Sequence, residues 1–343
     1  MEPKVTLATL SREIITEADA YLYLEGLYWG DTPRCAHCAS TNVSLMAPRG
    51  AAGRLTRSGE PTQRRTWQCK TCRKQFSVLT GTVMHGTRAS IRTWVLVMFE
   101  MCASKNGVSA REIERKYGLC PRTAWFMAHR LREAMKRDDS APLLTGTVVS
   151  DETWLGGDPK NRHANARVGQ PRYPRRVKTP VVTLINRETG EARSEMVHTV
   201  SGDTLYMVIK ANVNARYTHL QTDSAGAYQR VEWLFAEHTT VDHKAGQYVH
   251  TNGASTNLAE NYFSQLKRSL DGTHHHVSAE HLPRYLAEFD FRYSTRQVSD
   301  AARVRLLAKQ MGRRIEYKLA KAPASTLRDR PLGRSLFPEQ LAF

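Results

Sequence analysis

The spacing of apolar residues divides the chain into a helical first part and a second part that mixes strands with helices. Residues 11–30 and 88–137 carry apolar side chains at helical intervals. From residue 145 the pattern changes to short β-rich runs, at 146–151, 179–186, 193–200 and 218–223. Further helices are predicted at 203–212, 224–236, 256–271 and 278–296. Strands that alternate with helices predict an α/β or α+β domain in the second part.

The segment 109–134, SAREIERKYGLCPRTAWFMAHRLREA, is predicted to form two helices that divide at Gly118. Ser109 stands three residues before Glu112, which is the capping-box spacing, and Pro121 suits the first turn of a second helix. This pattern is typical of a helix-turn-helix, although an ordinary helical hairpin shares it. The predicted inward stripe consists of Ile113, Leu119, Ala124, Met127 and Leu131.

The second of these helices would then turn a polar face toward the major groove of DNA. The residues predicted on that outward face are Arg122, Thr123, Trp125 and His129. Arg130 and Arg132 are expected to contact phosphates rather than bases. These side chains are therefore the first candidates for DNA binding.

Charge strengthens the expectation of a nucleic-acid partner. The chain has 50 Lys and Arg against 33 Asp and Glu, so its net charge is +17. Such a basic chain predicts a polyanion such as double-stranded DNA as its partner. Residues 159–178 contain seven Lys or Arg, among them Arg175 and Arg176, and no acid. We expect these residues and the basic stretch 303–330 to contact phosphates, with a solvated loop as the alternative for 159–178.

Signals for a membrane or a secretory pathway are missing from the sequence. No apolar run approaches the roughly 18 residues that a membrane span requires. The first residues, MEPKVTLATL, lack the apolar core of a signal peptide. We therefore expect a cytoplasmic protein without membrane contacts.

Four of the six cysteines form two C-x-x-C pairs, Cys35 with Cys38 and Cys69 with Cys72. In a reducing compartment such pairs indicate zinc rather than disulfides. Four thiolates close a tetrahedral zinc shell, so the site is predicted to be structural and the surrounding segment to be a zinc ribbon. His37 is a less suitable alternative ligand because it lies between two cysteines. The remaining two cysteines, Cys102 and Cys120, are expected to be small buried residues.

Three acids are candidates for a second metal site. Asp151 and Asp223 each end a strand-like run, and parallel neighbouring strands would bring their carboxylates to one end of a sheet. Glu260 lies on the outer side of a predicted helix, on a face shared with Lys267. Three carboxylates on separate elements suit two magnesium ions that assist phosphoryl transfer. Glu152 competes with Asp151, but alternation along a strand turns it to the other face.

The sequence resembles the DDE-type transposases of bacterial insertion sequences that carry an N-terminal zinc ribbon. The resemblance covers roughly residues 15–300 and rests on EADAYLYLEGLYWGDTPRCAHC, WQCKTCRKQFSVLTGTVMHGT, SDETWLGG, TDSAGAY and AENYFSQLKRSLDGTHHHVSAEHLPRYLAEFDFRYSTR. It implies an RNase H-like catalytic domain in which Asp151, Asp223 and Glu260 bind the catalytic magnesium ions. The first knuckle, CAHCAS, and the longer stretch before Glu260 depart from the family pattern. Some relatives have Asn as the third residue, so Asn257 is a competitor of Glu260.

This interpretation predicts a multidomain protein. The expected parts are an N-terminal helix and zinc ribbon (1–84), a helix-turn-helix segment (85–140), an α/β RNase H-like domain with a mixed sheet (141–300) and a basic C-terminal tail (301–343). Lys267 and Arg268 join the candidate DNA-binding residues, and His274, His275 and His276 either line the DNA channel or have no role.

The predicted function is that of an insertion-sequence transposase. It would bind terminal inverted repeats, cut DNA at the element ends and transfer the 3′-hydroxyl strand to target DNA, as a homo-oligomer near the bacterial nucleoid. Two other functions share parts of this pattern. A zinc-ribbon transcription regulator would need no acids, and a structure-selective nuclease would cut junctions without joining strands.

Overall fold

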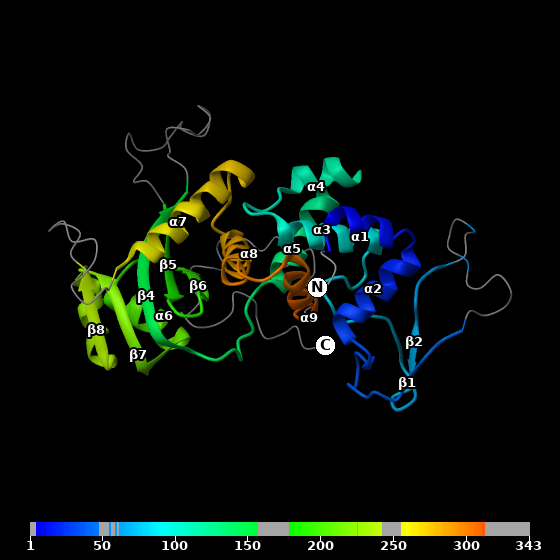
Figure 1. Ribbon diagram of the computed structural model, residues 1–343, viewed down its shortest axis with the longest axis horizontal. Coiled ribbons are helices and arrows are strands. Elements are labelled where there is room, and N and C mark those ends of the chain that lie inside the picture. Colours follow the sequence, from blue (N-terminus) through cyan, green and yellow to red (C-terminus); the bar gives the residue numbers. More distant parts are fainter. Residues whose placement is uncertain are drawn as a thin grey trace, which may run out of the picture. The chain divides into compact units, whose positions relative to one another are not determined.

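The computed structural model describes residues 5–47, 55, 59, 62–156, 178–224, 226–241 and 255–312. The described residues form two compact units (Figure 1). The first contains those up to Met135 together with those from Val298 onward, and the second contains those of Lys136–Gln297. No helix among the described ranges is long and apolar enough to cross a membrane.

The core of the first unit is built from helices that are distant in sequence. These are α1 (Leu7–Glu13), α2 (Glu17–Trp29), α3 (Ile91–Ala103) and α9 (Asp300–Lys309). Helix α9 contacts both α2 and α3, so the chain returns to the first unit after completing the second. The buried face of α3 includes Trp94, and Val304 and Leu307 of α9 are also fully buried. Helix α9 therefore belongs to this helical core, whereas the sequence predicts a separate tail over 301–343.

Helices α4 (Ala110–Tyr117) and α5 (Pro121–Ala134) pack against each other across a short turn. The Ser109 hydroxyl accepts the Glu112 N–H at 3.1 Å and caps α4. Gly118 ends α4 with a φ of +62°, a left-handed conformation that glycine adopts without strain. Pro121 occupies the first turn of α5, as its position in the sequence predicted.

A small antiparallel sheet carries the cysteine pairs. Its strands are β1 (Val43–Leu45), β2 (Trp67–Cys69) and β3 (Gln75–Phe76), in the order β1-β2-β3. Trp29 at the end of α2 packs edge-on against Trp67 and Phe76, which joins the sheet to the helices. Glu25 of α2 accepts hydrogen bonds from Arg65 Nε at 2.8 Å and from Trp67 Nε1 at 2.9 Å.

The second unit is built on a mixed five-stranded sheet, as expected from the sequence. The strands β4 (Leu144–Leu155), β5 (Thr179–Asn186), β6 (Ala192–Met196), β7 (Val213–Asp223) and β8 (Glu237–Val241) lie in the order β6-β5-β4-β7-β8. Strand β4 is antiparallel to β5 and parallel to β7. Its central position makes β4 the strand that all the surrounding elements share.

Helices cover both faces of this sheet. Helix α6 (Gly202–Asn212) packs on the face that contains Val148, and α7 (Asn257–Ser269) and α8 (Leu282–Ser294) pack on the face that contains Val149. Figure 1 shows α7 running across the sheet beside β4 and β5. Because adjacent residues of a strand point to opposite faces, the next residues of β4 are also divided between these two environments.

The structure differs from the sequence-based expectation between the two acids Asp223 and Glu260. The helix predicted at 224–236 is replaced by two short 3₁₀ turns, η3 (Gly226–Arg230) and η4 (Glu232–Leu234). Strand β8, which was not predicted, follows them and pairs in parallel with β7. Its sequence, EHTTV, is short and mostly polar, which suits a strand at the edge of the sheet.

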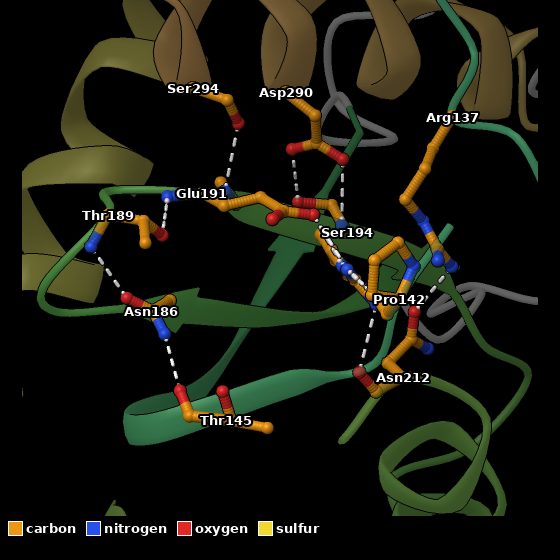
Figure 2. A network of polar contacts seen from close by, with 12 residues as sticks. Arg137, Pro142, Thr145, Asn186, Thr189, Glu191, Ser194, Asn212, Asp290 and Ser294 are labelled. Carbon is orange, nitrogen blue, oxygen red and sulfur yellow. Dashed lines mark hydrogen bonds and ion pairs between the residues drawn. The ribbon is translucent and has the colours of Figure 1, made fainter. Parts of the chain in front are cut away.

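A polar network fixes the β5–β6 hairpin to its surroundings (Figure 2). Asn186 donates from Nδ2 to the Thr145 carbonyl at 2.6 Å and accepts the Thr189 N–H at 2.7 Å. On the other side, the Ser294 hydroxyl of α8 accepts the Ala192 N–H at 3.0 Å. The hairpin therefore bonds both to the start of β4 and to the end of α8.

Candidate zinc centre and acidic site

The four paired cysteines converge in the first unit. Their sulfur atoms all lie within 4.8 Å of one another. Cys35 Sγ is 3.6 Å from Cys72 Sγ, and Cys38 Sγ is 3.6 Å from Cys69 Sγ. A tetrahedral ion with Zn–S bonds of about 2.3 Å would hold its sulfur ligands about 3.8 Å apart. The cluster therefore fits zinc, and it has no open position for a substrate.

The backbone around the cysteines favours the thiolate form that zinc requires. The Cys72 N–H donates to Cys69 Sγ at 3.4 Å, and the His37 N–H donates to Cys35 Sγ at the same distance. Hydrogen bonding from the Cys72 backbone is the largest cause that lowers the pKa of Cys69, to about 6. The Ser40 backbone also lowers the pKa of Cys38, but loss of water contact and the three neighbouring sulfur atoms outweigh it and raise that pKa. The His37 ring instead contacts the Gln75 carbonyl at 3.4 Å, outside the sulfur cluster. Cys102 is fully buried as predicted, whereas Cys120 is exposed, where it forms the N-cap of α5.

In the second unit, Asp151 and Asp223 lie on neighbouring parallel strands. The register pairs Val148 with Leu220 and Val149 with Gln221, a constant offset of 221 − 149, or 72 residues. The same offset applied two residues further places Asp151 opposite Asp223. Both carboxylates are half-buried, and both are on the sheet face that α7 covers. The parallel arrangement that the sequence predicted is thus present.

The side chains of Asp151 and its neighbour Glu152 have different hydrogen-bond partners. Asp151 Oδ1 accepts the Glu152 N–H at 2.7 Å, which orients the carboxylate. The Glu152 side chain points to the opposite face, where Tyr228 of η3 donates a hydrogen bond to Glu152 Oε1. Tyr228 also contacts the Ser150 hydroxyl at 2.9 Å. Glu152 is therefore held by a buried partner, while Asp151 lies on the face covered by α7.

Burial dominates the electrostatics of Glu152. Loss of water contact raises its pKa to about 7, the Tyr228 hydroxyl opposes that shift, and the negative charges of Asp151 and Asp223 add to it. The influence of both aspartates means that three carboxyl groups share this end of the sheet. Such repulsion between nearby carboxylates is relieved when a cation binds between them.

Glu260 lies in the first turn of α7 and is exposed. The buried side of this helix packs Ala259, Tyr262 and Phe263 against the same sheet face as Asp151. Among the described residues, only the four cysteines bring three or more potential ligand atoms within 4.8 Å of one another. Asp151 and Asp223 thus share the sheet face that α7 covers, Glu260 is exposed on that helix, and the three acids do not form a closed cluster among the described residues; Asn257 is exposed one turn earlier on α7.

The predicted outward face of α5 is only partly correct. Arg122 is exposed and Thr123 and Trp125 are half-buried, whereas His129 is fully buried with its ring 4.1 Å from the Trp125 ring. His129 cannot reach a base edge from that position. Arg130 and Arg132 are also buried, which contradicts their expected contacts with phosphates. The Arg130 guanidinium instead lies over the rings of Trp94 and Phe126 and donates to the His85 carbonyl.

The other candidate DNA-binding residues have different outcomes. Lys267 and Arg268 are exposed on α7, and Arg268 donates to the Ser264 hydroxyl at 3.0 Å. Arg175 and Arg176 lie outside the described residues. In the histidine triplet, the His274 ring packs edge-on against Tyr285, and His275 Nδ1 contacts the Asp271 carbonyl at 3.1 Å.

Sequence reasoning missed two buried tyrosines that organise this unit. Tyr228 contacts Glu152, and Tyr262 of α7 donates to Asp290 of α8. The TDSAGAY motif contained Tyr228, but only the fold shows that its hydroxyl reaches β4. Tyr262 is fully buried on the apolar side of α7, and nothing in the helical period distinguishes it from a purely hydrophobic core residue.

Two families match separate parts of the chain. Residues 15–75 match the transposase zinc-ribbon domain, and residues 143–294 match the ISXO2-like transposase domain. The chain is also 24% identical over 294 residues to an uncharacterized protein in the transposable element ISH50 of Halobacterium salinarum. That alignment covers 82% of this chain and 92% of the relative.

A weaker likeness links the chain to a solved structure, that of the simian T-cell lymphotropic virus intasome in complex with the PP2A regulatory subunit B56 gamma. It has 14% sequence identity and a TM-score of 0.26, and it covers 50% of this chain and 61% of the other chain. A score this low carries no argument about the fold. The likeness to transposases therefore rests on the two family matches and on the ISH50 relative.

Proposed function

Because the chain belongs to the insertion-sequence transposases, we propose that it binds the terminal inverted repeats of its own element and recombines them with target DNA. In the first step, a water oxygen would bond to the phosphorus at the element end and the 3′ oxygen would leave as a hydroxyl. In the second, that 3′-hydroxyl would bond to a target phosphorus and displace a target oxygen. Both steps are phosphoryl transfers, which depend on positioning and on neutralised charge.

The observation that supports this proposal is the parallel register of β4 and β7, which brings Asp151 opposite Asp223 when it is continued two residues past the Val149–Gln221 pair. Both acids are on the sheet face that α7 covers, and Glu260 is exposed in the first turn of that helix. Carboxylate oxygens suit magnesium, which keeps positions for water and phosphate oxygens. When bound, two such ions would activate the attacking oxygen and stabilise the leaving one. Asp151, Asp223 and Glu260 would hold them, and the Glu152 N–H would keep the Asp151 carboxylate oriented.

We assign the specific recognition of DNA to the first unit. The zinc ribbon and the α4–α5 pair form a compact body separate from the acids. Arg122, at the start of α5, is exposed and is the best-placed of the predicted contacts. In the second unit, Lys267 and Arg268 on α7 would contact the phosphates near the cut. Joining two element ends to one target further implies a homo-oligomer on DNA.

The test is a reaction of the purified full-length chain with cloned element ends, target plasmid and magnesium. A transposase produces both a cut at the element end and a joined product, and EDTA removes both. A transcription regulator would retard the DNA without cutting it. A structure-selective nuclease would cut branched junctions without producing the joined species, and either of these results would overturn the proposal.

A further inference from the structure

A groove of about 410 Å³ lies beside α7 in the second unit. Two arginines and three amide side chains contribute to its lining, together with an aromatic ring: Arg187, Arg296, Asn257, Asn261, Gln265 and Tyr293. None of the described lining residues is an acid. The groove therefore carries two positive charges and several N–H donors, a combination that favours phosphate oxygens.

The amide side chains belong to one flank of α7. Asn257, Asn261 and Gln265 are four residues apart, so they follow one line along the helix. At about 100° per residue, Glu260 and Lys267 lie on the other side of the exposed ridge. Helix α7 thus separates two polar rows, one with the candidate metal ligand Glu260 and one that lines the groove.

Bonds to the protein hold Arg296 in place. Arg296 Nη1 donates to the carbonyl oxygens of Gly190 at 3.1 Å and Tyr293 at 2.8 Å, and the guanidinium lies 4.2 Å from the centre of the Tyr293 ring. Gly190 has a φ of +71°, and a Cβ there would be 2.6 Å from Arg296 Nη2. The hairpin turn therefore requires glycine both for its backbone conformation and for the space that the guanidinium occupies.

The other arginine connects the groove to the acidic end of the sheet. Arg187 Nη1 donates to Gln221 Oε1 at 3.1 Å. Gln221 stands two residues before Asp223 on the same strand face, a separation of about 7 Å at roughly 3.3 Å per residue.

We propose that this groove binds the phosphate backbone of the DNA duplex next to the cut, so that Arg187 and Arg296 set the position of the scissile phosphate relative to Asp151 and Asp223. The inference rests on the proposed function for the identity of the DNA. Both guanidinium groups are already held by hydrogen bonds to the protein, so binding DNA would cost less side-chain entropy. The phosphates contacted here would be separate from those contacted by Lys267, which lies on the other row of α7.

The experiment measures duplex affinity of the full-length chain between 50 and 200 mM salt, in EDTA so that no cutting occurs. The double variant Arg187→Gln plus Arg296→Gln should bind more weakly, with the slope of log K against log salt reduced by about 0.9 for each lost contact. Lys210→Gln is the matched control, because Lys210 is exposed on α6, which packs on the other sheet face. It should leave the slope unchanged.

A second variant avoids the arginines, whose loss could disturb the hairpin. Asn261→Asp changes one exposed amide to a charge, so it should keep the melting temperature of the parent and still weaken binding several-fold. An unchanged slope in the double variant, or unchanged affinity in Asn261→Asp, overturns the groove. If the parent cuts element ends while these variants bind normally, only the groove is wrong. If the variants lose affinity while the parent never cuts, the proposed chemistry is wrong and the groove stands.

Discussion

Ser194 of β6 and Asp290 of α8 are joined by two hydrogen bonds, from the Ser194 N–H at 2.8 Å and from its hydroxyl at 2.9 Å (Figure 2). Tyr262 of α7 donates a third hydrogen bond to the same carboxyl group. One half-buried acid therefore connects the sheet edge to both helices on this face. Because α7 carries Glu260, the contact contributes to the placement of the third candidate metal ligand.

Asp290 makes the stability of the second unit depend on pH. Burial raises its pKa from 3.8 to about 7, although its hydrogen bonds and Arg137 oppose that shift. Between those values the folded state binds a proton that the unfolded state lacks, so stability falls as pH rises from about 4 to 7. The full change is on the order of 4 kcal/mol. Asp290→Asn, which cannot titrate, should lose this dependence in thermal melts at pH 5 and 8.

The informative comparison for Asp290 is the difference between the two proteins at each pH. Between pH 5 and pH 8, the melting temperature of the parent should fall further than that of Asp290→Asn. Parallel curves would mean that this carboxyl group does not titrate in that range.

Zinc removal should affect the first unit alone. Cys69→Ser removes one of four ligands, so zinc content should fall from about one ion per chain to near zero, because structural sites need a complete shell. Specific binding to element ends should fall with it. The second unit has its own sheet and core and should keep its melting transition. Elemental analysis and calorimetry measure both effects, and a Cys102→Ser control should retain its zinc.

The two arginines of α5 should respond to substitution in opposite ways. Arg130→Ala removes a buried guanidinium from between Trp94 and Phe126, so the first unit should lose about 2 kcal/mol of stability or more. Arg122→Ala changes an exposed side chain and should alter stability by less than about 0.5 kcal/mol, while weakening DNA binding. Urea denaturation beside a gel shift separates the two effects. Equal destabilisation by both would contradict the difference in burial.

Glu152→Gln should retain most of the joining activity. The amide oxygen of glutamine can still accept the Tyr228 hydrogen bond, and the side chain faces away from Asp151. We expect the rate to remain within about fivefold of the parent in a strand-transfer assay. A loss as large as that of an Asp151 variant would identify Glu152 as a metal ligand.

Local patterns predicted the elements that carry the sites. The caps at Ser109 and Pro121 and the parallel placement of Asp151 and Asp223 follow from short-range spacing and strand alternation. Residues 15–75 and 143–294, which match transposase families, also include both predicted metal sites.

Tertiary context decided the features that the sequence did not predict. His129 and Arg130 are polar, and polar residues of a helix are expected on its exposed side, yet both are buried. For Arg130 the reason is tertiary, because Trp94 of α3 packs against its guanidinium. The sequence of β8 has no apolar alternation, and this segment forms a strand through its hydrogen bonds to the neighbouring strand β7. Helix α9 begins 300 − 17, or 283, residues after the start of α2 and 300 − 91, or 209, residues after the start of α3, so no local pattern could predict that it packs against them.

The central claim is that Asp151, Asp223 and Glu260 together hold the ions for phosphoryl transfer. Its most direct test is a magnesium-dependent strand-transfer assay of Asp151→Asn on cloned element ends, run beside a gel shift on the same DNA. This substitution keeps the size of the side chain and removes its charge. Cutting and joining should both fall to background while end binding remains at the parental level. Full joining activity in Asp151→Asn would contradict the assignment.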